Sequence, residues 1–316
     1  MTVERVATNA QAQYLLSQIT RANSALDTTQ AQVASGKVST DYIGIGDKTA
    51  ALEAARAAAA RADAYASNTQ LAVTQTDLQD TQLTALSSLA EQLKQAISKA
   101  AGNSDGTNLM ATADDIFQQA SAILNSTDSN GTYIYGGGQG DTKPFTAASL
   151  SALAGGSVSS FFHNGTQKKS VVVGDGQSMQ IGVLASEVGT ELMTALNNLA
   201  NADSPSGSLD GALTGTQTAN LTDNILPSAT KAYTDLNAAT AVNGDTYNRL
   251  GDAAANQQSL STLYKGFVSD IEDVDMTQAV TKLNQNQVAL QAALEVTAKL
   301  GQLSLLNYLP ATTTTG

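Results

Sequence analysis

The two ends of the chain each repeat small or apolar side chains at alternating steps of three and four residues. This spacing is typical of a helix that buries one stripe against a partner helix, as in a coiled coil. From Met1 to Ser35 the chain has neither Gly nor Pro, so one continuous helix is expected there. Its stripe consists of Thr8, Ala12, Leu15, Ile19, Ala22, Leu26, Thr29 and Val33.

The C-terminal segment, Ile271 to Tyr308, carries two stripes on different faces. One partner helix cannot cover both faces, so the pattern predicts burial in a bundle or in an assembly of many copies. The expected seam is Met276, Val280, Leu283, Gln287, Leu290, Leu294 and Thr297. The second stripe is Ala289, Ala293, Val296, Leu300 and Leu303.

Helical patterns also fill much of the middle of the chain. The longest stretch without Gly or Pro is 47–101, which would form a helix about 80 Å long at about 1.5 Å per residue. In the return segment, Pro227 and Gly244 are expected to mark a start, a kink or a bend. The other expected helices are 109–125, 187–202 and 221–264.

A strand-like pattern interrupts the helices near the centre of the chain. Thr132–Tyr135 predicts a short strand, and Asn164-Gly165 between Phe161–His163 and Lys169–Val173 predicts a hairpin. Gly174–Gly176 is expected to be a second turn, before alternating apolar residues at Met179, Ile181 and Val183.

The expected fold class is therefore mainly α with a small β-rich insertion, as an elongated bundle built from both chain termini. The terminal helices pair, and the middle of the chain runs outward and returns. The expected parts are an N-terminal coiled-coil helix and connector (1–46), a long-helix part of a rod (47–132), a solvent-facing insertion (133–215), a return helix (216–266), and a C-terminal coiled-coil helix with a tail (267–316).

Composition supports a helical assembly protein over a compact enzyme. Aromatic residues make up 4% of the chain, and Trp and Cys are absent. A net charge of −12 without a basic cluster argues against a nucleic-acid partner. No apolar run reaches the roughly 18 residues of a membrane span, and there is no signal-peptide pattern. A chain of this kind is cytoplasmic or exported by another route.

No group of residues forms a convincing site of chemistry, so neither an enzyme, a cofactor nor a metal is expected. Gly136–Gly140 lacks the Lys-Ser/Thr of a phosphate-binding loop and is interpreted as a turn. The carboxylates at 270–275 lack the spacing of a calcium loop and are interpreted as an acidic first helical turn. His163 is the single histidine and has no implied catalytic partner.

Four short motifs resemble, in order, those of the bacterial flagellin family. They are Ala34-Ser35-Gly36-Lys37, then Tyr133-Ile134-Tyr135-Gly136-Gly137 with Lys143-Pro144-Phe145, then Gly244–Leu250 (GDTYNRL), then Ile271–Met276 (IEDVDM). The ending Leu303–Leu309 resembles the hook-associated members that join hook and filament. One departure is that Asp41–Asp47 lacks the pair of adjacent aspartates usual after the first motif.

The resemblance implies a structural subunit of the flagellum at the hook–filament junction, exported unfolded through the flagellar type III channel without a cleaved signal peptide. It implies terminal helices that are disordered in the monomer and fold on assembly. The implied partners are further copies of the chain, a hook-associated protein on the hook side, flagellin on the filament side and an export chaperone.

Two other functions stay open on the sequence alone: a short flagellin that forms the filament itself and, more distantly, a cytoplasmic helical scaffold or chemoreceptor-like protein. The apolar stripes are where contacts between copies are expected. The residues predicted to make those assembly contacts are Leu15, Ile19, Leu26, Val33, Val280, Leu283, Leu290 and Leu294.

Overall fold

The computed structural model describes residues 2–203 and 207–308, so the expected tail Pro310–Gly316 lies outside the described residues. Its contacts divide the chain into two compact units. The terminal unit comprises residues 1–60 and 261–316, and the central unit comprises residues 61–260. Helices dominate both units, and the strands form one two-stranded sheet. The expected fold class, mainly α with a small β element, is confirmed.

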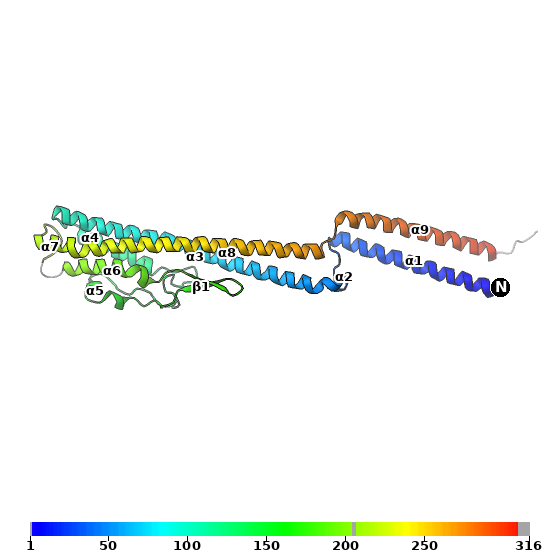
Figure 1. The fold of residues 1–316 in the computed structure, drawn as a ribbon, viewed down its shortest axis with the longest axis horizontal. Coiled ribbons are helices and arrows are strands. Elements are labelled where there is room, and N and C mark those ends of the chain that lie inside the picture. The colour runs from blue at the N-terminus through cyan, green and yellow to red at the C-terminus, as the bar shows by residue number, and fades with distance from the viewer. Residues whose placement is uncertain (1, 204–206, 309–316) are drawn as a thin grey trace, which may run out of the picture. The chain divides into compact units, whose positions relative to one another are not determined.

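In the terminal unit, α1 (Thr2–Ser35) and α9 (Met276–Tyr308) lie side by side and antiparallel (Figure 1). The short helices α2 (Tyr42–Ile45) and η1 (Gly46–Lys48) follow α1. The C-terminal helix begins at Met276, later than the expected Ile271. Asp275 causes this start, because its carboxylate accepts hydrogen bonds from the Thr277 and Gln278 amides at 2.9 and 3.1 Å.

Two long helices contribute residues to both units: α3 (Thr49–Asn103) and α8 (Leu226–Glu272). Pro227 lies inside a continuous helical run that starts at Gly215, directly after the π-helical turn at 221–225, so the wider turn accommodates its missing amide hydrogen. The helix then runs unbroken through Gly244, where a kink was expected, and through Gly251 and Gly266, and a Cβ at each of these glycines would meet nothing within 4 Å. Before α8, the chain forms α7 (Gly215–Asn220) and a π-helical turn, η3 (Leu221–Ile225).

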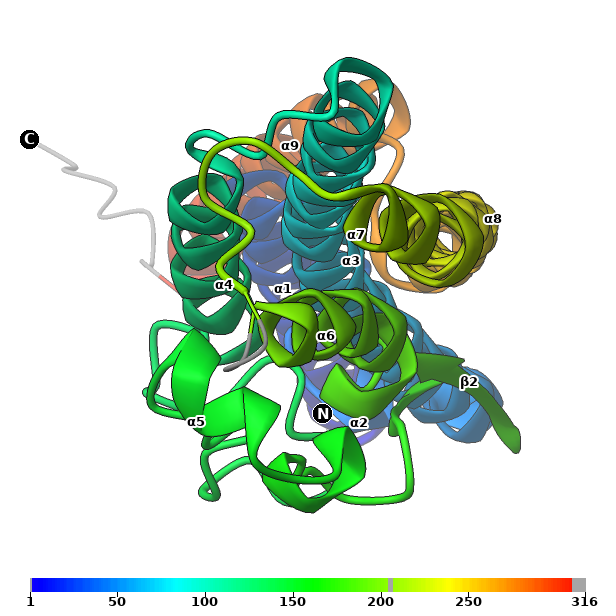
Figure 2. The ribbon, with the colours of Figure 1, turned by 90° about the vertical axis from the view of Figure 1, so that its left-hand side faces the viewer.

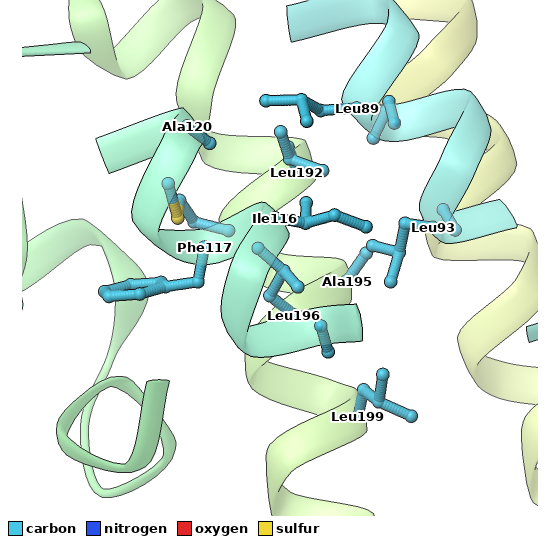
Figure 3. Close-up of a cluster of buried hydrophobic side chains, with 14 of the residues drawn as sticks. Leu89, Leu93, Ile116, Phe117, Ala120, Leu192, Ala195, Leu196 and Leu199 are labelled. Atoms are coloured by element: carbon cyan, nitrogen blue, oxygen red, sulfur yellow. The ribbon is translucent and has the colours of Figure 1, made fainter. Parts of the chain in front are cut away.

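The core of the central unit forms where α4 (Leu109–Leu124) and α6 (Ala185–Ala202) pack with α3 and α8 (Figure 2). Leu93 of α3, Ile116 of α4 and Leu192 of α6 are at most 1% exposed and point toward one another (Figure 3). The short helix α5 (Leu150–Ala154) covers α6. Leucine and alanine supply most of this core, as their frequency in the sequence suggested.

The sheet is a single antiparallel hairpin of β1 (Lys169–Gly174) and β2 (Gln177–Ile181), in which Val171 pairs with Met179. Val173 and Ile181 are buried with Ala72 and Val73 of α3 and Leu250 of α8. The alternation of apolar and polar residues therefore marked these two strands correctly.

Two other expected β elements are wrong. Thr132–Tyr135 forms turns with one isolated bridge, and the segment before Asn164 forms the 3₁₀ helix η2 (Val158–Phe161). The Asn164 side chain is used for a different purpose: it bonds the amide and the hydroxyl of Ser186 at 3.1 and 3.0 Å, in the first turn of α6. A side chain that fixes a helix start competes with the hairpin turn that Asn-Gly otherwise favours.

Candidate functional site

The face of α1 that packs on α9 is the stripe expected from the sequence. From Leu15 onward, the six stripe positions are buried or half-buried, and Thr29 is the most shielded at 6% exposed. The side chains of Thr8 and Ala12 lie outside those described. The predicted contact residues on this helix, Leu15, Ile19, Leu26 and Val33, are all half-buried, and α9 is the helix that packs on α1.

The face of α9 that packs on α1 differs from the expected seam. Leu283 and Leu290 lie on it, whereas Val280 and Leu294 are 41% and 50% exposed. Successive helical residues are about 100° apart, so a shift of one position turns a different face to the partner. The shielded stripe of α9 is Ala279, Leu283, Asn286, Leu290, Ala293 and Thr297.

Asn286 provides the polar contact in this interface. Its Nδ2 atom donates to the Ala25 carbonyl oxygen at 3.2 Å and to Thr29 Oγ1 at 3.3 Å. The Nδ2 group of Asn286 therefore has two acceptors on α1, and the hydroxyl group of the shielded Thr29 has a hydrogen-bond partner.

Large apolar side chains remain uncovered on the same two helices. On α9 they include Met276 at 45%, Val280 at 41% and Leu294 at 50% exposed. These three residues share one helical face, next to the stripe that contacts α1, and we call them the outer stripe. Tyr14 and Leu16 of α1 are also exposed, at 63% and 64%. Large exposed apolar side chains that gather on one helix pair typically mark a protein interaction site.

Three charged residues link the helix ends of the terminal unit, and we call them the clamp: Lys37, Arg56 and Glu272. The Glu272 side chain is 9% exposed, and its carboxylate pairs with Lys37 Nζ and, at 2.7 Å, with an Arg56 guanidinium nitrogen. The hydrogen bond from Lys37, followed by that from Arg56, lowers the pKa of Glu272 below its usual value.

Main-chain hydrogen bonds reinforce the clamp. The Val38 amide donates to the Glu272 carbonyl oxygen at 2.7 Å, and the Val274 amide donates to the Gly36 carbonyl oxygen at 2.9 Å. Gly36 adopts a φ of 71°, the left-handed conformation that ends α1. Two motifs of the family resemblance, Ala34–Lys37 and Ile271–Met276, thus meet in space.

The carboxylates at 270–275 have separate roles and do not converge. Glu272 belongs to the clamp, Asp273 accepts a hydrogen bond from Ser269, and Asp275 caps α9. In the part of the chain that the structure describes, no three His, Cys, Asp or Glu side chains are grouped so as to hold a metal ion.

The glycine-rich segment after Tyr135 is packed against neighbouring main chain. The Gly138 amide donates to the Gln167 carbonyl oxygen at 3.0 Å, and the Gly165 amide donates to the Gly136 carbonyl oxygen at 2.9 Å. At Gly137, with a φ of 60°, a Cβ would lie 2.6 Å from the Gln167 oxygen. These glycines permit close approach of two loops, which agrees with their interpretation as a turn.

Two side chains singled out by their chemistry have no catalytic arrangement around them. His163 is exposed on the loop after η2. Tyr135 is fully buried, and desolvation by burial raises the pKa of its phenol. Tyr135 therefore contributes to the core, where the Ala185 amide donates to its carbonyl oxygen at 3.0 Å and positions the start of α6.

The comparisons with known proteins agree with this arrangement. Residues 226–309 match the family described as the bacterial flagellin C-terminal helical region, which confirms the resemblance to flagellins. The C-terminal helices of the chain are therefore similar to those of flagellins, and the fold is mainly helical. No curated protein sequence matches the chain significantly.

Two solved structures share the fold. One is a protein of Vibrio parahaemolyticus assigned as a flagellar hook-associated protein, with a TM-score of 0.58, 15% identity and coverage of 74% of this chain and 99% of that one. The other is FlgL of Bacillus cereus, with a TM-score of 0.51, 17% identity and coverage of 69% and 98%. Within the described ranges, no helix has the length and apolar character needed to cross a membrane.

Proposed function

We propose that this chain is a structural subunit of the bacterial flagellum that polymerises at the junction between hook and filament, the role of hook-associated protein 3. The observation that carries this proposal is the outer stripe of α9. Met276, Val280 and Leu294 remain exposed although α1 already covers the neighbouring face of the helix. A second copy that buried this stripe would remove apolar surface from water, which favours association.

The α1–α9 pair leaves apolar surface that other copies of the chain could bury. Its shielded positions are mostly half-buried, so a single pair gains little from burial compared with a packed core. Helices of this kind are marginal alone and gain stability from packing. Assembly would supply the missing packing, and the predicted contacts at Val280 and Leu294 would then join neighbouring chains, whereas those at Leu283 and Leu290 would hold the pair itself.

This role also assigns a place in the assembly to each segment of the chain. Residues 133–215 form the solvent-facing insertion between the rod segments 47–132 and 216–266, and the helices at 1–46 and 267–316 form the assembling end. The chain has a mechanical role and no enzymatic one. It is exported through the flagellar type III channel with the help of a chaperone and is located outside the cell. Its partners are further copies, a hook-associated protein and flagellin.

The junction role is favoured over the filament role by the C-terminal sequence. The residues Leu303–Leu309 resemble the hook-associated members, and the two structural neighbours are a hook-associated protein and FlgL. A short flagellin that forms the filament itself is the competing outcome of the test below.

Immunogold labelling of intact flagella with antibodies against this chain distinguishes these roles. We expect a single band of label at the base of each filament, and detached filaments in a deletion strain. Label along the whole filament would identify a flagellin instead. Flagella without any label, together with a motile deletion strain, would contradict a flagellar role.

A further inference from the structure

The helix α9 offers two apolar faces to a partner, and α1 packs on the less apolar one. The expected seam and the shielded stripe share Leu283 and Leu290. Where the seam has Val280, Gln287 and Leu294, the shielded stripe has Ala279, Asn286 and Ala293. Apolar content alone therefore does not explain which face α1 covers. We propose that Asn286 selects the face of α9 on which α1 packs and so keeps the outer stripe free.

The hydrogen bonds of Asn286 give this selection a physical cause. Its amide reaches the Ala25 carbonyl oxygen at 3.2 Å and Thr29 Oγ1 at 3.3 Å, beside the most shielded described position of α1. If α9 turned its outer stripe toward α1, this amide would lose both protein partners, and Thr29 Oγ1 would no longer accept a bond from it. A polar residue within an apolar seam specifies pairing in this way, at some cost in stability.

The clamp does not make this selection by itself. It fixes where α1 ends relative to Val274, because its main-chain bonds join Val38 to Glu272 and Val274 to Gly36. These bonds set the register at one end of the pair, but α9 begins only after them, at Met276. A second contact must therefore fix the rotation of α9 about its own axis. Asn286 is placed to do so, because it lies beyond the first two turns of this helix.

Paired cysteines can measure the rotation, because the natural chain has no cysteine. Counted from Asn286, which bridges Ala25 and Thr29, the antiparallel helices place Ile19 level with residues 293 and 294, of which Ala293 lies on the shielded stripe. The first reporter, Ile19→Cys with Ala293→Cys, detects the observed face. The second reporter, Ile19→Cys with Leu294→Cys, detects the rotated one. Adjacent positions on α9 close loops of nearly equal length, so loop entropy is the same for both reporters.

The experiment measures the disulfide of each reporter at equilibrium in a glutathione buffer, on the full-length chain. Trimethylamine N-oxide is added because it favours burial and keeps the helices paired. We expect the disulfide of the first reporter to be favoured by about fivefold over that of the second, the factor that corresponds to the roughly 1 kcal/mol net contribution of a typical hydrogen bond.

The variant Asn286→Ala removes both hydrogen bonds and adds little apolar surface to the shielded stripe, so it should reduce this preference several-fold, while helicity stays equal or rises. Thr29→Val removes one of the two acceptors and should act in the same direction. The matched control is Asn284→Ala, the same chemical change at a nearby exposed position, which should leave the preference unchanged.

Each result decides the question. Equal stability of the two reporter disulfides in the otherwise natural chain would overturn the proposed role of Asn286. An unchanged preference in Asn286→Ala, or an equal loss in Asn284→Ala, would overturn it as well. Because the assay uses the free chain, its outcome is independent of whether the chain polymerises.

Discussion

Arg56 and Glu272 are 216 positions apart in the sequence, yet a guanidinium nitrogen of one lies 2.7 Å from a carboxylate oxygen of the other. The contact joins the first part of α3 to the last residue of α8, and Lys37 adds the segment that follows α1. Three helix ends of the terminal unit therefore depend on one carboxylate. That carboxylate is also the most shielded member of the clamp.

Replacing this carboxylate should loosen the terminal unit. Glu272→Gln keeps the size of the side chain but removes the charge, and we expect a loss of about 1–3 kcal/mol, as for hydrogen bonds to charged groups. Faster hydrogen exchange at the Val38 and Val274 amides would report it. The control is Glu53→Gln, which removes an exposed partner of Arg56 at 3.1 Å and should cost under about 1 kcal/mol. Equal effects of the two changes would contradict the importance of the clamp.

The clamp should also respond to acid. Its two cations hold the pKa of Glu272 below the value of the unfolded chain. A carboxyl group of this kind stabilises the fold above its unfolded pKa of about 4.3, and the contribution is lost as the pH falls through the lower folded pKa. The stability difference between the parent and Glu272→Gln should therefore be constant near neutral pH and shrink below about pH 4. Denaturant unfolding across this pH range measures it, and a difference that stays constant would refute it.

A charged residue at two leucine positions of α9 should affect two different properties, the pairing of the terminal helices and polymerisation. Leu290→Asp places a carboxylate against α1 and should unpair the terminal helices, at a cost of several kcal/mol, while the central unit stays folded. Leu294→Asp is half-exposed in the single chain, so helicity should persist while polymerisation stops. Circular dichroism and sedimentation separate the two effects.

The control for this pair is Thr281→Asp, an exposed polar position of α9 that should leave both properties unchanged. If the Leu294→Asp protein formed normal polymers, the outer stripe would not be an assembly surface.

Adjacent glycines should differ sharply in their tolerance of alanine. At Gly137, the positive φ and the 2.6 Å approach to a carbonyl oxygen make a Cβ strained, so Gly137→Ala should destabilise the central unit by more than about 1 kcal/mol. At Gly138, the nearest atom to a Cβ is 3.9 Å away, and Gly138→Ala should be nearly neutral. Thermal melting of both variants tests the contrast, which equal melting temperatures would disprove.

The sequence was sufficient for features that depend on local periodicity. The stripe from Leu15 to Val33 and the alternation around Val171 and Met179 appear in the structure as expected, because burial follows the period of the helix or strand. The expected stripe of α9 differs from the observed one by a single position at three sites. The sequence pattern counts apolar side chains and contains no information on the hydrogen bonds that Asn286 makes with α1. A partner 257 positions away, Thr29, cannot be recognised from local pattern.

The clamp could not be predicted from the local sequence pattern either, because its residues are far apart in the chain. Glu272 stood among acidic neighbours that were interpreted together, whereas the structure separates them by what each one contacts. The resemblance to flagellins singled out both Ala34–Lys37 and Ile271–Met276, but it did not indicate that these two segments are in contact. The Asn164-Gly165 turn was misassigned because Asn164 bonds to Ser186, a contact that requires α6 to be in place.

The three glycines inside α8 have a mechanical consequence. Nothing fills the space beside them, so alanine would fit at Gly244, Gly251 and Gly266 and would raise helix propensity by about 1 kcal/mol at each. The glycines therefore lower the intrinsic helical stability of α8, although packing does not require them. Local opening of α8 should therefore begin at these positions rather than at its core-facing residues, such as Leu236.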